Sequence, residues 1–318
     1  MTTLASRRNL WYLISLLVII PGLVSLILNG VRPGIDFTGG TLWEVQFDVP
    51  ATSEQIANVL AANGIDNPRI QATGDAAAND YLIRLPELTE GSPQKDAIET
   101  GFAEQIGPFV EREFSTVGGA LSTEIRDRAI LAVLFASIAI VAYIAYAFRN
   151  TQNPFLYGVC ALVAMLHDVL VVLGVFSILG AVAGVEIDAL FVTAMLTVIG
   201  FSVHDTIVVF DRIRENLGAR VEGTFEGVVN YSLAQTVVRS LNTSLTVLLT
   251  LLALFLFGGS TTREFVLALL IGVLSGTYSS IFNASQLLVS WENGEIQRFF
   301  GRLSRRGPGS GPAVAPSR

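Results

Sequence analysis

The chain has 318 residues, of which 51% are hydrophobic and only 15% are charged, and its mean hydropathy is +0.57. Soluble domains carry about 25% charged residues, so this composition excludes water as the main solvent and predicts a membrane protein. The net charge of −7 would argue against a nucleic-acid partner if it were evenly spread, but the acids gather in one segment and the arginines in others, an asymmetry that membrane topology explains better than a partner does. The single cysteine, Cys160, excludes an intrachain disulfide. Cys160 falls in an apolar run, where we expect it to be a small buried hydrophobe.

The first predicted element is a membrane span. Residues 10–28 are apolar over about the 20 residues that a crossing needs, and Arg7 and Arg8 precede them. A cleaved signal peptide is the alternative, but its apolar region usually has about 7–15 residues and ends at a small-x-small cleavage site. No such site follows here. We therefore expect a cytoplasmic N-terminus at 1–9 and a transmembrane helix at 10–29.

Residues 30–125 form a predicted water-exposed domain. Between 30 and 124 there are 15 Asp and Glu against five Lys and Arg, a local net charge of −10. Alternation, a capping-box pattern at Thr52 to Gln55 and the pair Ser92-Pro93 mark its elements. These are a strand at 41–49, a helix from 52 to about 63, strands at 69–73 and 81–85, a helix from 92 to about 106 and a strand at 109–117. The order β-α-β-β-α-β predicts a ferredoxin-like α+β fold.

Five further apolar runs follow within residues 126–291, each near the length that a bilayer requires. They lie at about 127–148, 154–179, 187–210, 241–257 and 265–289. The fold class is therefore an α-helical polytopic membrane protein with six transmembrane helices and one α+β domain between the first two. The remaining tail, 292–318, is rich in Gly, Pro, Ser and Arg, and we expect it to be disordered.

The arginines predict the orientation. The loops at 149–153 and 211–240, with the tail, hold Arg149, Arg212, Arg214, Arg220, Arg298, Arg302, Arg305 and Arg306. The opposite loops hold none at 180–186 and only Arg263 at 258–264. Because positive residues favour the cytoplasmic side, both termini are expected there and the acidic domain outside. Arg126 and Arg128, at the outer mouth of the second span, are exceptions.

An acid lies well inside the fourth span. Asp205 sits in the run from Val198 to Asn216, where a carboxylate costs several kcal/mol unless it faces protein or water. Intramembrane acids of this kind usually mark an ion or proton path. The alternative is a helix-packing acid kept neutral by hydrogen bonds to Ser202 or to a neighbouring span.

Other polar residues in the spans are also clustered. In the last span Ser279, Asn283, Gln286 and Ser290 share one helical face, which we expect to meet protein instead of lipid. Gly272 and Gly276 form a small-xxx-small pair that allows close helix approach. The start of the fifth span is polar enough to predict an interior or aqueous vestibule, through Arg239, Asn242, Thr243, Ser244 and Thr246.

Three stretches together resemble the SecD/SecF family of resistance-nodulation-division type membrane proteins. They are residues 34–41 (GIDFTGGT), residues 198–216 around Asp205, and residues 239–244 (RSLNTS). The resemblance covers about residues 10–291 in order and spacing. It implies a subunit of the bacterial cytoplasmic membrane that pairs with SecD as a heterodimer beside the SecYEG channel. Auxiliary membrane subunits, the translocating preprotein and protons are its other implied partners.

The resemblance also implies a mechanism and its residues. The family uses the proton-motive force to pull preprotein outward; its proton-path acid falls on Asp205 and its basic partner on Arg239. Approach to the permanently charged arginine favours the ionised acid, and retreat favours the protonated one. His204 stands where the family commonly has Asn, and it either joins the relay or substitutes for that hydrogen-bonding residue.

Two further groups keep two interpretations each. His167 and Asp168, in the third span, are also familiar from the family and serve either structural hydrogen bonding or the relay. The charged residues at the cytoplasmic end of the fourth span either anchor the interface or contact a partner or proton exit. These residues are Asp211, Arg212, Arg214 and Glu215.

The sequence carries no enzyme motif. A GxxxxGK[ST] phosphate loop, a nucleophile elbow and a metal-binding histidine pair are absent, so no cofactor and no metal are expected. Gly39-Gly40 is interpreted as a turn before a strand. Two other functions stay open: half of a proton-driven exporter of small molecules or lipids, and a scaffold that binds the channel without moving protons. The single small outer domain favours the export subunit, because related exporters typically carry larger paired domains and twelve spans.

Overall fold

The structure, a computed structural model, describes residues 4–66, 68–73, 79–149, 151, 153–219, 221, 223–259 and 262–298. The chain divides into two compact units, and each is described by itself. The first, the helical unit, comprises Met1–Leu28, Ala136–Val175 and Ala194–Arg318, and the second, the outer unit, comprises Asn29–Phe135 and Phe176–Thr193. Arg220 and the tail beyond residue 298, with Arg302, Arg305 and Arg306, lie outside the described residues.

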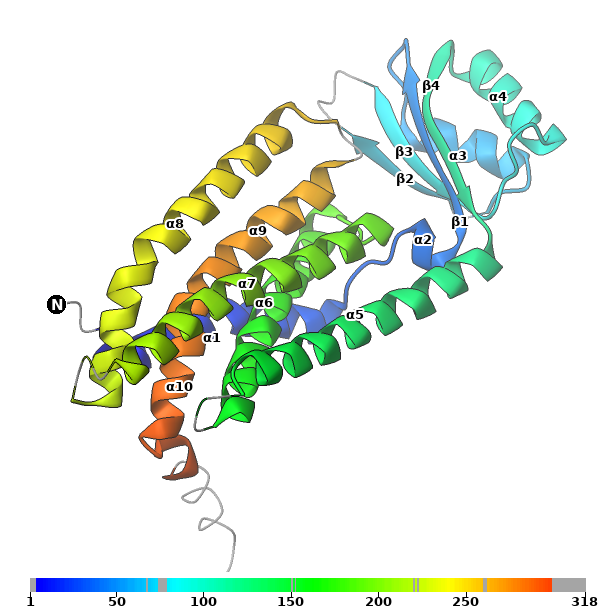
Figure 1. The fold of residues 1–318 in the computed structure, drawn as a ribbon. Helices are drawn as coiled ribbons and strands as arrows, with labels where there is room; N and C mark the ends of the chain where they lie inside the picture. Colours follow the sequence, from blue (N-terminus) through cyan, green and yellow to red (C-terminus); the bar gives the residue numbers. More distant parts are fainter. Residues whose placement is uncertain are drawn as a thin grey trace, which may run out of the picture. The chain divides into compact units, whose positions relative to one another are not determined.

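The outer unit contains the predicted ferredoxin-like domain. Its elements are β1 Gly40–Phe47, α3 Ser53–Ala62, β2 Arg69–Thr73, β3 Asp80–Leu85, α4 Pro93–Gln105 and β4 Phe109–Val117. The strands are ordered β2-β3-β1-β4 and every pair is antiparallel. Each βαβ unit is therefore split by a third strand, and α3 and α4 pack on the same face of the sheet (Figure 1). The predicted order and topology are confirmed.

Local sequence signals fix this domain. Thr52 accepts a hydrogen bond from Gln55 N while the Gln55 side chain accepts one from Thr52 N, so the predicted capping box is present. Ser92 caps α4 ahead of Pro93, as expected. Alternate residues of β1 and β3 point at the two helices, and Trp43, Phe47 and Phe102 are among the fully buried side chains of the core.

Six helices are long and apolar enough to cross a membrane, within the part of the chain that the structure describes. They are α1 Arg8–Asn29, α5 Gly119–Ala147, α6 Pro154–Ala183, α7 Ala189–Gly218, α8 Phe225–Phe257 and the last helix. The last helix consists of α9 Arg263–Ser279, a π-helical turn at Ser280–Ala284 and α10 Ser285–Glu292. A short helix, α2 Ile35–Thr38, precedes β1.

The helices extend beyond the predicted apolar runs, because hydropathy detects only the apolar part of a helix. α7 continues to Gly218 and α8 begins at Phe225, so the prediction of a loop over 211–240 is wrong. Thr224 caps α8 by accepting from Gly227 N. The early turns of α8 are amphipathic, with one buried face at Val228, Val229, Ser232, Leu233, Thr236 and Ser240.

Arg126 and Arg128, the exceptions to the arginine distribution, lie on the first turns of α5. Arg128 pairs with Glu124 one turn away at 2.6 Å, and Arg126 pairs with Asp127 at 3.3 Å. Both pairs are exposed. The positive-inside rule counts Lys and Arg residues and not net charge, so these pairs leave both arginines as exceptions to the pattern.

Small residues bring helices of the helical unit together. A Cβ on Gly272 would lie 2.1 Å from Val198 Cγ2, and a Cβ on Gly276 would lie 3.2 Å from Ser202 Cβ. The predicted close-approach pair therefore packs α9 against α7. On the same last helix Ser279, Asn283, Gln286 and Ser290 are buried, so the prediction that this face meets protein is confirmed, as is the burial of Cys160.

Candidate functional site

The interior face of α7 carries the site. Ser202, Asp205 and Thr206 are nearly inaccessible, while His204 points out of the unit and is exposed. This follows from the helical repeat, since positions 202, 205, 206 and 209 lie on one side of a helix. The close packing of α9 at Gly272 and Gly276 covers that side.

Asp205 is buried and only half satisfied. Its side chain is 7% exposed, and Ser240 Oγ on α8 donates to its Oδ1 at 2.6 Å. Its Oδ2 is buried and has no hydrogen-bond partner among the described residues. An ionised carboxylate with a bare buried oxygen is costly, whereas a protonated one places its hydrogen there at far lower cost. The geometry suits a group that gains and loses a proton.

The partner of Asp205 is the one that the helix-packing alternative expects from a neighbouring span, since Ser240 belongs to α8. The other two expected partners, Ser202 and Arg239, make no hydrogen bond or ion pair with it in the described part of the chain. Ser202 does not bond to it, because the Ser202 hydroxyl donates to Asp168 instead. Arg239 precedes Ser240 on α8, yet its side chain is exposed. No ion pair joins Arg239 to Asp205 among the residues described here, because adjacent helix positions point about 100° apart and Ser240 occupies the contact. In this conformation the acid and the arginine are separated.

Asp168, on α6, is the opposite case. Its side chain is 1% exposed and its two oxygens receive four contacts. Ser202 on α7 and Ser275 and Ser279 on α9 each donate a hydroxyl at 2.6 Å. His167 Nδ1 lies 3.0 Å from Oδ1. An ionised carboxylate has about four acceptor positions, so Asp168 is saturated and ties three helices together. This favours the structural interpretation of Asp168.

His167 keeps one open position. Its Nε2 is buried without a hydrogen-bond partner in the described part of the chain, and its ring stacks on Tyr278 with centroids 6.0 Å apart. Ser15 on α1 donates to the hydroxyl of the same Tyr278 at 3.4 Å and to Asn283 Oδ1 on the π-helical turn at 3.0 Å. The last helix is therefore irregular where polar side chains of α1 and α6 meet it, and π-helical turns are frequent at functional sites.

The charged residues at the end of α7 neutralise one another. Arg214 pairs with Asp211 at 2.7 Å and Arg212 with Glu215 at 2.6 Å, both one turn apart and exposed. Asn216 reaches across to α8, donating to Ser232 at 2.9 Å and to Gln235 at 3.1 Å. These contacts favour the anchoring interpretation for this cluster.

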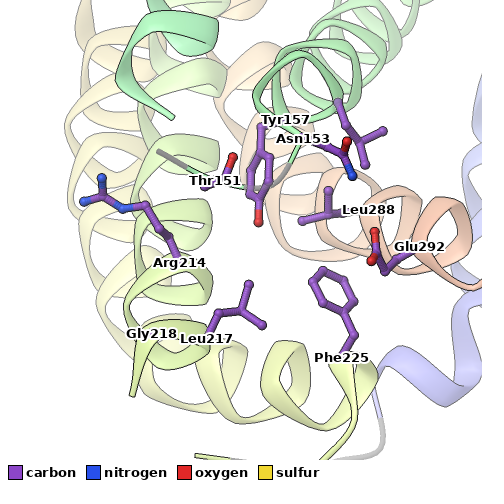
Figure 2. A pocket seen from close by; sticks show the side chains of 10 residues that line it. Thr151, Asn153, Tyr157, Arg214, Leu217, Gly218, Phe225, Leu288 and Glu292 are labelled. Carbon is purple, nitrogen blue, oxygen red and sulfur yellow. The ribbon is translucent and has the colours of Figure 1, made fainter. Parts of the chain in front are cut away.

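A cavity of about 330 Å³ lies at the neighbouring helix ends (Figure 2). Leu217, Phe225 and Leu288 form apolar walls, the Tyr157 hydroxyl points into it, and the guanidinium of Arg214 points away. Arg214 is the one cation among its lining residues and is held by Asp211. Neither Asp205 nor Asp168 lines it, so the cavity is separate from the buried acids.

The sequence located the acids but missed their donors. Ser240 and Ser275 carried no signal of their own, since a lone serine in a span commonly bonds to its own helix. Ser279 belonged to the predicted polar face, and Ser275 lies one turn before it. Extending that face by one turn is the signal that identifies Ser275.

Comparison with known proteins finds matches over most of the chain. Residues 98–294 match the family described as "Protein export membrane protein SecD/SecF, C-terminal", and residues 24–51 match the "SecD/SecF GG Motif". A protein translocase subunit SecF of Thermobaculum terrenum is 56% identical over 302 residues, covering 93% of this chain and 95% of the relative. A SecF of Anaerolinea thermophila is 45% identical, with 95% and 98% covered.

Among solved structures, the chain is similar to a Thermus SecDF described as a translocon-associated membrane protein. The TM-score is 0.77 and the identity 34% over 91% of this chain. The chain spans 38% of that longer protein, and likewise 38% of a Bacillus subtilis SecDF to which it is 34% identical.

Proposed function

Since the chain belongs to the SecD/SecF family of protein export membrane proteins, we propose that it is the SecF-type subunit of a bacterial protein translocase. The observation that carries this proposal is identity to named SecF subunits along nearly their whole length. The exporter hypothesis is not favoured, because the named relatives are translocase subunits. The subunit would lie in the cytoplasmic membrane with both termini inside, as the arginines indicate.

A SecD-type partner is the second part of the proposal. Both SecDF chains are much longer than this one, so the portion that it matches is joined there to a further portion. α8 supplies support from this chain: Arg239 and Asn242 are exposed on a helix apolar enough to span the membrane. Lipid is a poor surrounding for these side chains, and a partner subunit would cover them. His204 is exposed on α7 and suits the same environment.

Proton coupling is the third part, and Asp205 carries it. One oxygen of this buried carboxyl group accepts a hydrogen bond and the other has no partner among the described residues. Burial of an unpaired oxygen disfavours the charged form, so the carboxyl group favours binding a proton there. Movement of α8 that brings Arg239 toward Asp205 would favour the ionised acid and release that proton. Alternation between the two arrangements would couple proton entry to helix movement, and thereby to export beside a SecYEG-type channel.

Export into inverted vesicles tests this function. Asp205→Asn keeps size and hydrogen bonding but removes the proton, so the complex should assemble in normal amounts and lose only the gradient-stimulated part of export. Asp211→Asn is the matched control, because it changes an exposed acid of the same helix. A parent-like gradient response in Asp205→Asn would refute the proton role and make His167 with Asp168 the better pair to examine. Failure of a SecD-type chain to copurify would refute the subunit assignment.

A further inference from the structure

The loop between α6 and α7 is hydrogen-bonded to the linker that follows α1, within the outer unit. Ile187 N donates to Arg32 O at 2.8 Å, and Gly34 N donates to Ile187 O at 2.7 Å. The two segments form a short parallel bridge there. A Cβ on Gly34 would lie 3.1 Å from Ile187 O, so the close approach favours glycine. The entry to the outer domain is thereby attached to the start of α7.

Two carboxylates cap α7 at that point. Asp188 Oδ1 accepts from Phe191 N at 2.7 Å, an ordinary cap from the residue before the helix. Asp36 Oδ2 accepts from Ala189 N at 2.8 Å, across 153 residues of sequence. The first backbone N–H groups of a helix lack partners within it and attract negative charge. Burial raises the pKa of Asp188 and the nearby Asp36 adds to this, so the helix end holds two mutually repelling acids.

The segment that carries Asp36 leads directly into the sheet. It forms α2, ends at Gly39 with φ of 73°, and enters β1 through Gly40 with φ of 115°. A Cβ on Gly40 would lie 2.7 Å from Leu85 O, so this entry is tightly packed as well as left-handed. The backbone between Asp36 and the first strand is therefore short and tightly packed, so a displacement of Asp36 is transmitted to β1.

Two side-chain contacts reinforce the attachment. Arg84 on β3 lies with its Nε 2.9 Å from Glu186 Oε2, and both side chains are largely buried. Gln71 on β2 donates to Ala183 O at the end of α6 at 3.3 Å. Strands β2 and β3 are thus joined to the end of α6 and to the middle of the α6–α7 loop.

We propose that Asp36 is a positioning residue that ties the outer domain to α7, so that a displacement of α7 on proton loading moves the outer domain. The inference rests on the proposed function. α7 is one continuous helix from Ala189 to Gly218, and it carries Asp205. A shift along such a helix moves its first turn, where Asp36 is bound. Residues of the segment that matches the GG motif acquire roles in this way: Gly34 permits the approach to Ile187, Asp36 caps α7, and Gly39 with Gly40 leads into the sheet.

The test measures movement in the complete complex in proteoliposomes. Labels replace exposed Glu90 in the outer domain and exposed Gly223 between α7 and α8, in a Cys160→Ser background. The distance between the labels is compared with and without a proton gradient in the parent. The same comparison is made in Asp36→Ala, in Asp36→Asn and in Asp96→Ala, which alters an exposed acid in the first turn of α4.

The expected result is a gradient-dependent distance change in the parent and in Asp96→Ala that disappears in Asp36→Ala. Asp36→Asn should give a distance change between those of the parent and of Asp36→Ala, because a neutral hydrogen bond is weaker than a charge-assisted one. Proton binding at Asp205, followed by infrared spectroscopy, should remain parent-like in every variant, which a general loss of structure would not allow.

A parent-sized distance change in either Asp36 variant overturns the inference. The inference is also overturned if the distance between the labels in the parent does not change with the gradient while export still responds to it. That result would leave the proposed function standing. Loss of the Asp205 infrared signal in the parent would instead count against the proposed function. The two failures are therefore distinguishable.

Discussion

Two acids lie inside the helical unit, and their hydrogen bonds give them opposite properties. Asp168 accepts from three serine hydroxyls and lies beside a histidine nitrogen, so both of its carboxyl oxygens are occupied. Asp205 receives one hydroxyl and keeps a bare buried oxygen. An acid with every acceptor position filled holds helices together, and an acid with a position left open can take a proton.

Replacing Asp168 by Asn should destabilise the helical unit. The amide offers one acceptor oxygen where several donors converge, and hydrogen bonds to a charged group contribute about 1.5–3 kcal/mol each. We expect a loss of about 2–5 kcal/mol, as for other broken buried charge networks. Thermal unfolding of the purified protein measures it. Asp211→Asn should shift the transition little, and an equal shift in both variants would contradict the structural role of Asp168.

The ion pair between Arg8, near the N-terminus, and Glu295, after the last helix, should weaken at low pH. Arg8 donates to Glu295 and holds the pKa of that carboxyl below its usual value of 4.5. A carboxyl whose pKa is lower when folded adds stability above the unfolded pKa, and the contribution is lost as pH falls through the folded pKa.

Glu295→Gln should therefore lower the unfolding temperature slightly at neutral pH and not at pH values well below 4.5. The effect is small because the Glu295 side chain is 36% exposed. Unfolding of parent and variant across this pH range measures the difference. A difference that stays constant over the whole range would show that the carboxylate makes no charge-dependent contribution.

At the scale of helices, α9 packs on α7 through a glycine that admits no larger residue. Gly272→Ala should destabilise by about 1–3 kcal/mol, because a Cβ at 2.1 Å from Val198 forces the two helices apart. Gly200→Ala is the matched control: it is helical too, has nothing within 4 Å of its added Cβ, and should stabilise by up to about 1 kcal/mol through helix propensity. Equal effects on thermal unfolding would argue against this packing.

The sequence predicted the elements well where local signals decide them. The caps at Thr52 and Ser92 and the alternation in β1 and β3 depend on neighbours in the chain, so the outer domain follows from its own pattern. The amphipathic start of α8 was missed because hydropathy weighs apolar content alone. The π-helical turn at Ser280–Ala284 was missed as well, because the residues of that segment carry no local sequence signal for a π-helix.

The site was predictable only in part for the same reason. Asp205 is conspicuous as a charge in an apolar run, whereas its donor Ser240 comes from another helix and is specified by packing. Asp36 lies in the stretch 34–41 that carries the family resemblance, but its bond to Ala189 spans 153 residues and leaves no local pattern. Pairing across helices is a tertiary property.

At the scale of the whole molecule, the arginine distribution predicts the orientation in the membrane. A cysteine replacing exposed Glu90 should react with an impermeant thiol reagent outside the cytoplasmic membrane, and one replacing Gly223 should not. Cys160 is buried and is replaced by Ser to remove background. Reversed labelling would invert the topology.

We propose that Asp205 gains and loses a proton while the complex works. Infrared difference spectroscopy of the reconstituted complex, stepped in pH, detects the carbonyl band of a protonated carboxyl directly. We expect a titrating band in the parent and in Asp211→Asn that is missing from Asp205→Asn. The same band persisting unchanged in Asp205→Asn would contradict it, because the proton would then reside elsewhere.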